Sequence, residues 1–222
     1  MAALISIIVP THNEKANAGP LYRRLKAVFD GLAGYDFELI FCDDSRDETP
    51  QEIARLHALD RRVKLIRLSR RFSQAIAITA GLKRASGEAA ILMDADLQDP
   101  PEAIPRLLEL WREGNEVVYV ERESASDYVL YRLFSVVFYR LLRRMSSIEI
   151  PVDAGEFRLL DRKVVDFLQG LTERTRYYRG LTVWPGLRQA KVRIERAARH
   201  SGKTNYNFRR SLMIAVDGWV SF

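Results

Sequence analysis

The sequence has few of the residues that form disulfides or zinc sites. It contains one cysteine, Cys42, and three histidines, His12, His57 and His200, which lie far apart in the chain. A single cysteine excludes an internal disulfide framework and fits a reducing compartment. With one sulfur ligand and scattered imidazoles, the sequence shows no zinc-binding pattern. His12 falls on the loop after the first predicted strand, where it could touch a ligand, but we interpret it as a histidine without a specific role.

Long hydrophobic runs are also missing. No stretch reaches the about 18 apolar residues of a transmembrane helix, and the nearest, residues 128–142, is interrupted by Arg132 and Arg140. The apolar start, residues 1–10, has neither a basic lead nor a cleavage site, so it predicts a strand rather than a signal peptide. A P-loop and a G-x-S-x-G elbow are absent, so nothing supports P-loop or serine-hydrolase chemistry.

The composition is that of a folded, basic domain. Hydrophobic residues make up 47% of the 222 residues, which is enough for the core of one sizeable α/β domain and argues against disorder. The formal net charge is +6 and the pI is about 9.5. This surplus suggests an anionic partner, which could be nucleic acid, nucleotide, phosphate or acidic lipid. The charge alone does not choose among them.

Strand and helix patterns alternate along the first half of the chain. The predicted strands are residues 5–10, 37–45, 63–69, 89–97 and 116–122. Apolar residues at helical spacing lie between them and include a predicted helix over residues 73–87. This alternation is typical of βαβ units and predicts a parallel, doubly wound sheet. After residue 122 the pattern changes to a long apolar helix over about residues 127–145 and a final amphipathic helix, which we interpret as an elaboration of one domain.

Acidic residues follow three of the predicted strands. Glu14 follows the first strand, Asp43 and Asp44 end the second, and Asp94 and Asp96 end the fourth. Ligands of parallel α/β sheets bind beyond the carboxyl ends of the strands, so we expect these acids along one rim. The pair at positions 43 and 44 has two open interpretations, because it could form a turn and helix cap or hold a ribose or base.

The D-x-D pattern after the fourth strand predicts a metal site. Residues two apart in a strand point the same way, so Asp94 and Asp96 would share a side, which Gln98 could join. Three oxygen donors at this spacing suit Mg²⁺ or Mn²⁺, which usually bind through one or two carboxylates and substrate phosphates. The alternative is that these aspartates and Asp99 cap the helix that begins near Pro100.

Several motifs together resemble one enzyme family. They are "SIIVPTHNE" (6–14), "FELIFCDDSRDET" (37–49), the segment 67–102 with "DADLQDPPE", the segment 150–166 with "DAGEFRLLDR", and the segments 179–189 and 201–210. The chain is similar over nearly its whole length to family-two glycosyltransferases. More narrowly, it resembles the polyprenyl-phosphate sugar transferases, such as dolichyl-phosphate mannose synthase and the bacterial undecaprenyl-phosphate glucosyltransferases.

The resemblance implies a fold and a place in the cell. It implies the GT-A fold, a Rossmann-like and mostly parallel sheet flanked by helices, with a C-terminal amphipathic helix. Residues 1–205 would form the catalytic domain and residues 206–222 the helix at the membrane interface. Transmembrane helices follow this helix in many such enzymes, and we expect them beyond residue 222. The protein would be membrane-associated, with its catalytic domain on the cytoplasmic face.

The resemblance also implies roles for individual residues. The nucleotide pocket would be lined by Pro10, Glu14 and Asp43. The metal site under the donor diphosphate, which would hold Mg²⁺ or Mn²⁺, would be formed by Asp94, Asp96 and Gln98. The catalytic residues would be Asp96 and Asp153, the latter as candidate base beside the acceptor phosphate. Phosphate-binding cations would be Arg122, Arg199 and Lys203.

The implied reaction is an inverting, metal-dependent hexosyl transfer. The donor would be a nucleotide sugar, UDP-glucose in preference to GDP-mannose, and the acceptor a polyprenyl phosphate. A phosphate monoester is largely dianionic at neutral pH, so Asp153 would orient the acceptor more than deprotonate it. Alternatively, Asp153 is a turn residue before Gly155.

Other functions and partners follow from weaker signals. A family-two glycosyltransferase with a soluble or polysaccharide acceptor is one alternative. A basic nucleic-acid-binding module is another, but the basic residues lack interleaved aromatics, so we expect no nucleic acid partner. The expected partners are the nucleotide sugar, the lipid phosphate and the membrane surface, and self-association into a homo-oligomer stays open.

Overall fold

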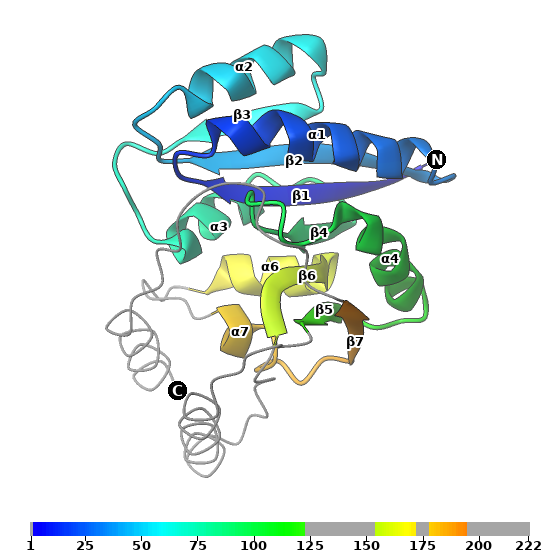
Figure 1. The fold of residues 1–222 in the computed structure, drawn as a ribbon. Coiled ribbons are helices and arrows are strands. Elements are labelled where there is room, and N and C mark those ends of the chain that lie inside the picture. Colours follow the sequence, from blue (N-terminus) through cyan, green and yellow to red (C-terminus); the bar gives the residue numbers. More distant parts are fainter. Residues whose placement is uncertain (1, 123–153, 172–177, 195–222) are drawn as a thin grey trace, which may run out of the picture.

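The computed structural model describes residues 2–122, 154–171 and 178–194. Within these ranges the chain forms a seven-stranded sheet with helices on both faces (Figure 1). The strands are β1 (Ala3–Thr11), β2 (Tyr35–Asp43), β3 (Val63–Arg67), β4 (Ala89–Leu92), β5 (Val117–Arg122), β6 (Ala154–Asp161) and β7 (Gln189–Ile194). The helices are α1 (Lys15–Asp30), α2 (Thr49–Leu59), α3 (Gln74–Leu82), the 3₁₀ turn η1 (Pro101–Ala103), α4 (Ile104–Arg112), α6 (Arg162–Gly170) and α7 (Tyr178–Leu181).

The sheet is mostly parallel, as the sequence predicted. Its strand order is β3-β2-β1-β4-β6-β5-β7, and the pairs β1–β2, β2–β3, β1–β4 and β5–β7 are parallel. Only β6 is antiparallel to its neighbours, β4 and β5. Since both pair with β6 in this way, β4 and β5 run in the same direction. The carboxyl ends of β1, β2, β4 and β5 therefore lie at one edge of the sheet.

The sequence analysis predicted no strand after residue 122, so β6 and β7 correct it. β6 lies between two sheet strands, with Leu92 opposite Arg158 and Glu121 opposite Ala154. Arg158 is charged but only 2% exposed. Because charged residues are usually exposed, its presence makes this segment resemble a surface region rather than a buried strand. Pairing partners far away in the chain, rather than local propensity, make this segment a strand.

Each face of the sheet packs against its own helices. Side chains of β1 alternate, so Ile5, Ile7 and Val9 contact the layer of α1, α2 and α4, whereas Ile8 contacts the layer of α3 and α6. Burying one such aliphatic side chain contributes about 1.5–3 kcal/mol, so the two clusters supply much of the stability. The predicted helix over residues 127–145 and the helix over residues 206–222 lie outside the described residues.

The fourth strand and the helix before it are shorter than predicted. β4 ends at Leu92 rather than continuing to residue 97, and α3 spans Gln74–Leu82 rather than residues 73–87. Leu97 has φ of 62°, which an extended strand cannot contain. Asp94 and Asp96 therefore lie in a turn after the strand, and the strand argument for their shared direction does not apply.

Candidate active site

The polar residues predicted at the strand ends lie at the carboxyl edge of the sheet. Pro10 is opposite Cys42 in the β1–β2 register, one position before the end of β1. Glu14 is the N-cap residue of α1, and its Oε2 accepts a hydrogen bond from Asn17 Nδ2 at 2.5 Å. Both residues are half-buried, so each contributes part of its surface to the rim.

Asp43 is fully buried below this rim. Its carboxylate accepts hydrogen bonds from Thr11 Oγ1 at 3.0 Å and from Ser45 Oγ at 2.5 Å, and it pairs with Arg67 Nη1 at 3.1 Å. These partners stand at the ends of β1, β2 and β3. Asp43 therefore ties three strand ends together, and these hydrogen-bond partners offset the cost of burying its carboxyl group.

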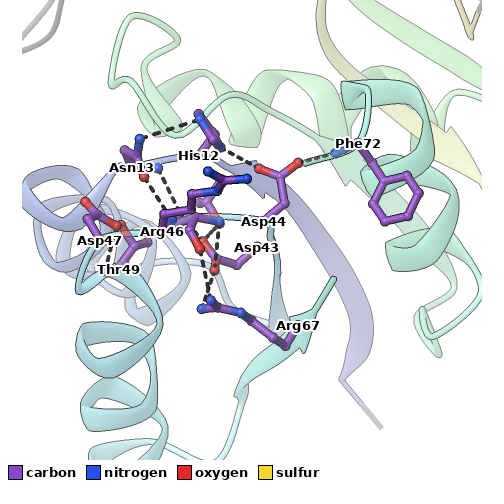
Figure 2. A network of polar contacts seen from close by, with 11 residues as sticks. His12, Asn13, Asp43, Asp44, Arg46, Asp47, Thr49, Arg67 and Phe72 are labelled. Carbon is purple, nitrogen blue, oxygen red and sulfur yellow. Dashed lines mark hydrogen bonds and ion pairs between the residues drawn. The ribbon is translucent and has the colours of Figure 1, made fainter. Parts of the chain in front are cut away.

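The neighbouring acid, Asp44, contacts His12 and the backbone of Phe72 (Figure 2). Its Oδ1 lies 2.6 Å from His12 Nδ1, and its Oδ2 accepts the backbone N–H of Phe72 at 2.7 Å. Its side chain is 8% exposed and that of His12 is 30% exposed. His12 thus has a defined contact that sequence reasoning missed. The sequence does contain a hint of this contact, because His12 directly follows the first strand, and Asp43 and Asp44 stand at the end of the second strand.

Two further hydrogen bonds join the loops after β1 and β2 (Figure 2). The backbone N–H of Asn13 donates to Ser45 Oγ at 2.7 Å, and the backbone N–H of Arg46 donates to Asn13 Oδ1 at 3.1 Å. Asn13 has φ of 59°, a left-handed conformation that asparagine tolerates better than most residues. Two hydrogen bonds therefore connect the loops after β1 and β2.

The acidic turn after β4 presents alternate residues to solvent. Asp94, Asp96 and Gln98 are half-exposed, whereas Ala95 and Leu97 are buried. The turn itself is held by the backbone N–H of Gln98, which donates to Asp96 Oδ1 at 3.1 Å. The three oxygen-bearing side chains therefore share the accessible side, although a turn and not a strand places them there.

This donor set fits a hard divalent cation shared with a substrate. Two carboxylates and one amide oxygen are ligands that Mg²⁺ and Mn²⁺ prefer. In the described part of the chain, no group of three or more His, Cys, Asp or Glu residues could hold a metal by itself. A cation at Asp94, Asp96 and Gln98 would therefore complete its shell with other oxygens, such as those of a diphosphate.

Two arginines belong to the β5–β6 side of the edge. Arg122 is the last residue of β5. Arg158 of β6 donates from Nη1 to Thr182 Oγ1 at 2.9 Å and from Nη2 to the Gly155 carbonyl at 2.7 Å. Sequence reasoning did not single out Arg158, because its burial between strands has no local signal. It anchors the start of β6 to the segment that follows α7.

Some predicted site residues cannot be placed. Asp153, Arg199 and Lys203 lie outside the described residues, as does most of the segment 121–128. Ala154, which directly follows Asp153 in the chain, is the first residue of β6 and pairs with Glu121 near the carboxyl end of β5. Among the helices of the described ranges, none is long and apolar enough to cross a membrane.

Comparison with known proteins gives a consistent result. The model of the family "Glycosyl transferase family 2" matches residues 6–168. The uncharacterized glycosyltransferase YkcC of Bacillus subtilis is 43% identical over 219 residues, which cover 98% of this chain and 68% of the relative. The bactoprenol glucosyl transferase of Shigella phage SfV is 36% identical over 220 residues, which cover 98% of this chain and 71% of the relative.

A solved structure shares the fold at low sequence identity. Glucosyl-3-phosphoglycerate synthase from Mycobacterium tuberculosis, in complex with Mn²⁺, UDP-glucose and phosphoglyceric acid, superposes with a TM-score of 0.63 at 18% identity. The match covers 99% of this chain and 79% of that chain. The architecture of the described sheet and helices is therefore that of the GT-A fold.

Proposed function

The chain belongs to glycosyl transferase family 2, and on that premise we propose that it transfers glucose from UDP-glucose to a polyprenyl phosphate at a membrane surface. One observation carries the choice of acceptor and sugar. A relative that is 36% identical over 98% of this chain is a bactoprenol glucosyl transferase, and bactoprenol is a polyprenol. GDP-mannose is the second candidate donor, which the transfer assay compares with UDP-glucose.

The donor would lie over the carboxyl ends of β1, β2 and β4. Pro10 and Glu14 would contact the nucleotide from the loop after β1. Asp43 is fully buried, so its part would be to hold Thr11 and Arg67 in place around the pocket. The interlocked loops support this role because a preorganised pocket loses less conformational entropy on binding.

The leaving diphosphate would be held at the acidic turn. Asp94, Asp96 and Gln98 would bind Mg²⁺ or Mn²⁺, and the solved fold relative that holds Mn²⁺ and UDP-glucose supports this assignment. Such a cation, when bound, supplies positive charge beside the phosphate oxygens that become negative as the glycosidic bond breaks. The turn keeps the three side chains on one accessible side, so they can act together.

The acceptor would approach from the β5–β6 side. β6 begins at the carboxyl edge of the sheet, which supports a position for Asp153 close to the reacting groups. An acceptor phosphate is already largely dianionic at neutral pH, so Asp153 would orient it and act as base only for the remaining proton. Arg122, with Arg199 and Lys203, would supply the positive charge that holds this phosphate.

Membrane contact would come from the C-terminal part of the chain. Residues 206–222 carry Arg209 and Arg210 beside apolar residues that include Trp219 and Phe222. Basic residues combined with Trp and Phe suit a helix that lies at the lipid interface. The net charge of +6 favours an anionic membrane surface, which on the cytoplasmic face carries acidic lipids.

A transfer assay tests the proposal. The purified protein is incubated with labelled UDP-glucose or GDP-mannose, undecaprenyl phosphate in detergent, and Mn²⁺ or Mg²⁺. We expect labelled glucose in the lipid extract, in a reaction that EDTA stops. Label that passes instead to a polysaccharide without lipid phosphate would show a different acceptor, and failure with every donor would remove the proposal.

A further inference from the structure

A hydrogen bond connects α3 with the acidic turn. Gln74 is the first residue of α3, and its Nε2 donates to Asp94 Oδ1 at 2.7 Å. The two residues are 20 positions apart in the chain, and no motif in the sequence joins them. Gln74 is thus a neutral donor that contacts one of the carboxylates assigned to the cation.

The segment before α3 contacts the loop after β2. Two residues before Gln74, the backbone N–H of Phe72 donates to Asp44 Oδ2 at 2.7 Å. Asp44 in turn contacts His12. Residues 72–74 therefore connect the loops after β1 and β2 with the acidic turn after β4.

The body of α3 is held by tight packing on the sheet. Ala77, Ile78 and Leu82 are at most 4% exposed. At Gly81, a Cβ atom would lie 2.4 Å from Ile8 Cγ2, so the helix touches β1 with no space to spare. This close packing restrains the movement of α3 relative to β1.

From this geometry we propose that Gln74 is a positioning residue, which orients the Asp94 carboxylate for the divalent cation of the donor site. The inference rests on the proposed function. The amide donates one N–H to Oδ1 and so restrains rotation of the carboxylate, as outer-shell partners of metal ligands do. Being neutral, it does not oppose a cation by charge, as a lysine or arginine at the same place would.

Asp94 and Asp96 receive hydrogen bonds from different elements. Asp96 receives a hydrogen bond from the backbone of its own turn, through the N–H of Gln98. The contact of Asp94 with Gln74 comes from a separate element. Loss of the Gln74 amide therefore changes one carboxylate of the pair and leaves the turn intact.

The test compares two substitutions of Gln74 with a matched control. Gln74→Met keeps the length of the side chain but has no N–H donor, and Gln74→Ala removes both. Gln51→Ala changes an exposed glutamine in the first turn of α2 and serves as the control. Mn²⁺ binding to the full chain is followed by the electron paramagnetic resonance signal of free Mn²⁺, with UDP present and the Mn²⁺–UDP complex subtracted.

We expect Mn²⁺ to bind about tenfold more weakly to both Gln74 variants, in the range typical of outer-shell partners. The control should bind as the wild type does, and all variants should unfold at similar temperatures. In the transfer assay, the Mn²⁺ activation constant should rise in both Gln74 variants, with the KM for UDP-glucose at saturating Mn²⁺ unchanged.

Two results would count against the inference, and they are distinguishable. If the wild type binds Mn²⁺ and Gln74→Met binds it equally well, Gln74 has no positioning role and the proposed function stands. If the wild type with UDP binds no Mn²⁺ at all, the metal-dependent mechanism fails, and the role of Gln74 fails with it.

Discussion

His12 Nδ1 lies 2.6 Å from Asp44 Oδ1, although the two residues are 32 positions apart in the chain. The other oxygen of Asp44 holds the backbone N–H of Phe72. One carboxylate therefore joins the loops that follow β1 and β3, and it does so at the edge assigned to the donor. We expect these contacts of Asp44 to help order the loops.

Asp44→Ala should loosen the loop before α3. The Phe72 N–H would lose its acceptor in a part-buried hydrogen bond, and such a bond contributes about 0.5–1.5 kcal/mol. Hydrogen exchange followed by mass spectrometry should show faster exchange at residues 68–73 in this variant. Asp30→Ala, on the exposed end of α1, is the control. Unchanged exchange in the Asp44 variant would mean that other contacts order the loop.

Asp96→Asn should abolish turnover without unfolding the protein. The substitution removes one negative charge from the predicted metal site but keeps the size of the side chain, and Asp96 is half-exposed, so the core is not disturbed. The transfer assay and Mn²⁺-dependent UDP binding measure the effect, for which we expect at least about a hundredfold loss of rate. Asp166→Asn, at an exposed position of α6, should behave as wild type. Normal activity of Asp96→Asn would remove this residue from the mechanism.

Gly81→Ala should destabilise the fold. The added methyl group would lie 2.4 Å from Ile8 Cγ2 and 2.9 Å from Cys42 Sγ, so α3 would have to move away from the sheet. Overpacking of this kind costs about 1–3 kcal/mol, which urea unfolding can measure. Gly170→Ala is the matched control, because nothing lies within 4 Å of its added Cβ atom. Equal stability of both variants would show that α3 can shift without cost.

The thiol of Cys42 should be inert in the folded protein. Burial raises the pKa of Cys42 to about 12, so almost no reactive thiolate exists at about pH 8. Ellman's reagent should react with Cys42 only in denaturant. A second thiol introduced at an exposed position, Ala16→Cys, should react at once in the same solution. Rapid reaction of Cys42 in native protein would reveal local opening between α3 and β2.

The carboxylate of Glu38 should make stability depend on acid pH. Burial alone would raise the pKa of Glu38, but hydrogen bonds from Lys64, Ser6 and Ser86 outweigh it and lower the pKa below its usual value of 4.5. A carboxyl group whose pKa is lower in the folded state stabilises the protein above its unfolded pKa. That stability is lost as the pH falls through the folded pKa.

Urea unfolding between about pH 2 and pH 7 tests the role of Glu38. The wild type should lose stability on the acid side, and Glu38→Gln should be less stable at neutral pH but show a shallower acid loss. Glu113→Gln, at an exposed position, should keep the wild-type pH profile. Parallel profiles for the wild type and Glu38→Gln would mean that other carboxylates cause the acid loss.

The predicted fold was confirmed in the part of the chain where patterns of neighbouring residues identify each strand and helix. Alternating strands and helices between residues 5 and 122 correspond to β1–β5 and the helices between them, because hydrophobic periodicity reports on one element at a time. β6 was missed for the opposite reason. Its position between β4 and β5 depends on pairing across the sheet, and its buried Arg158 conceals it in a hydrophobicity pattern.

The candidate site was predictable in part. Residues Glu14, Asp43, Asp94, Asp96 and Gln98 follow strands in the sequence, and the structure brings their elements to one edge because the strands are parallel. Their metal and nucleotide contacts stay predictions. The turn at Leu97, which places Asp94, Asp96 and Gln98, was not predicted from the sequence.

By itself, the sequence determined the family, the α/β alternation and the acidic residues after the strands, because each of these can be recognised from residues close together in the chain. Only the tertiary structure decided that Asp43 is enclosed while Asp44 joins His12 to Phe72, and that Gln74 contacts Asp94. The physical reason is that these contacts join residues 20 or more positions apart. The packing of helices on the sheet sets such distances, and no local pattern in the chain contains them.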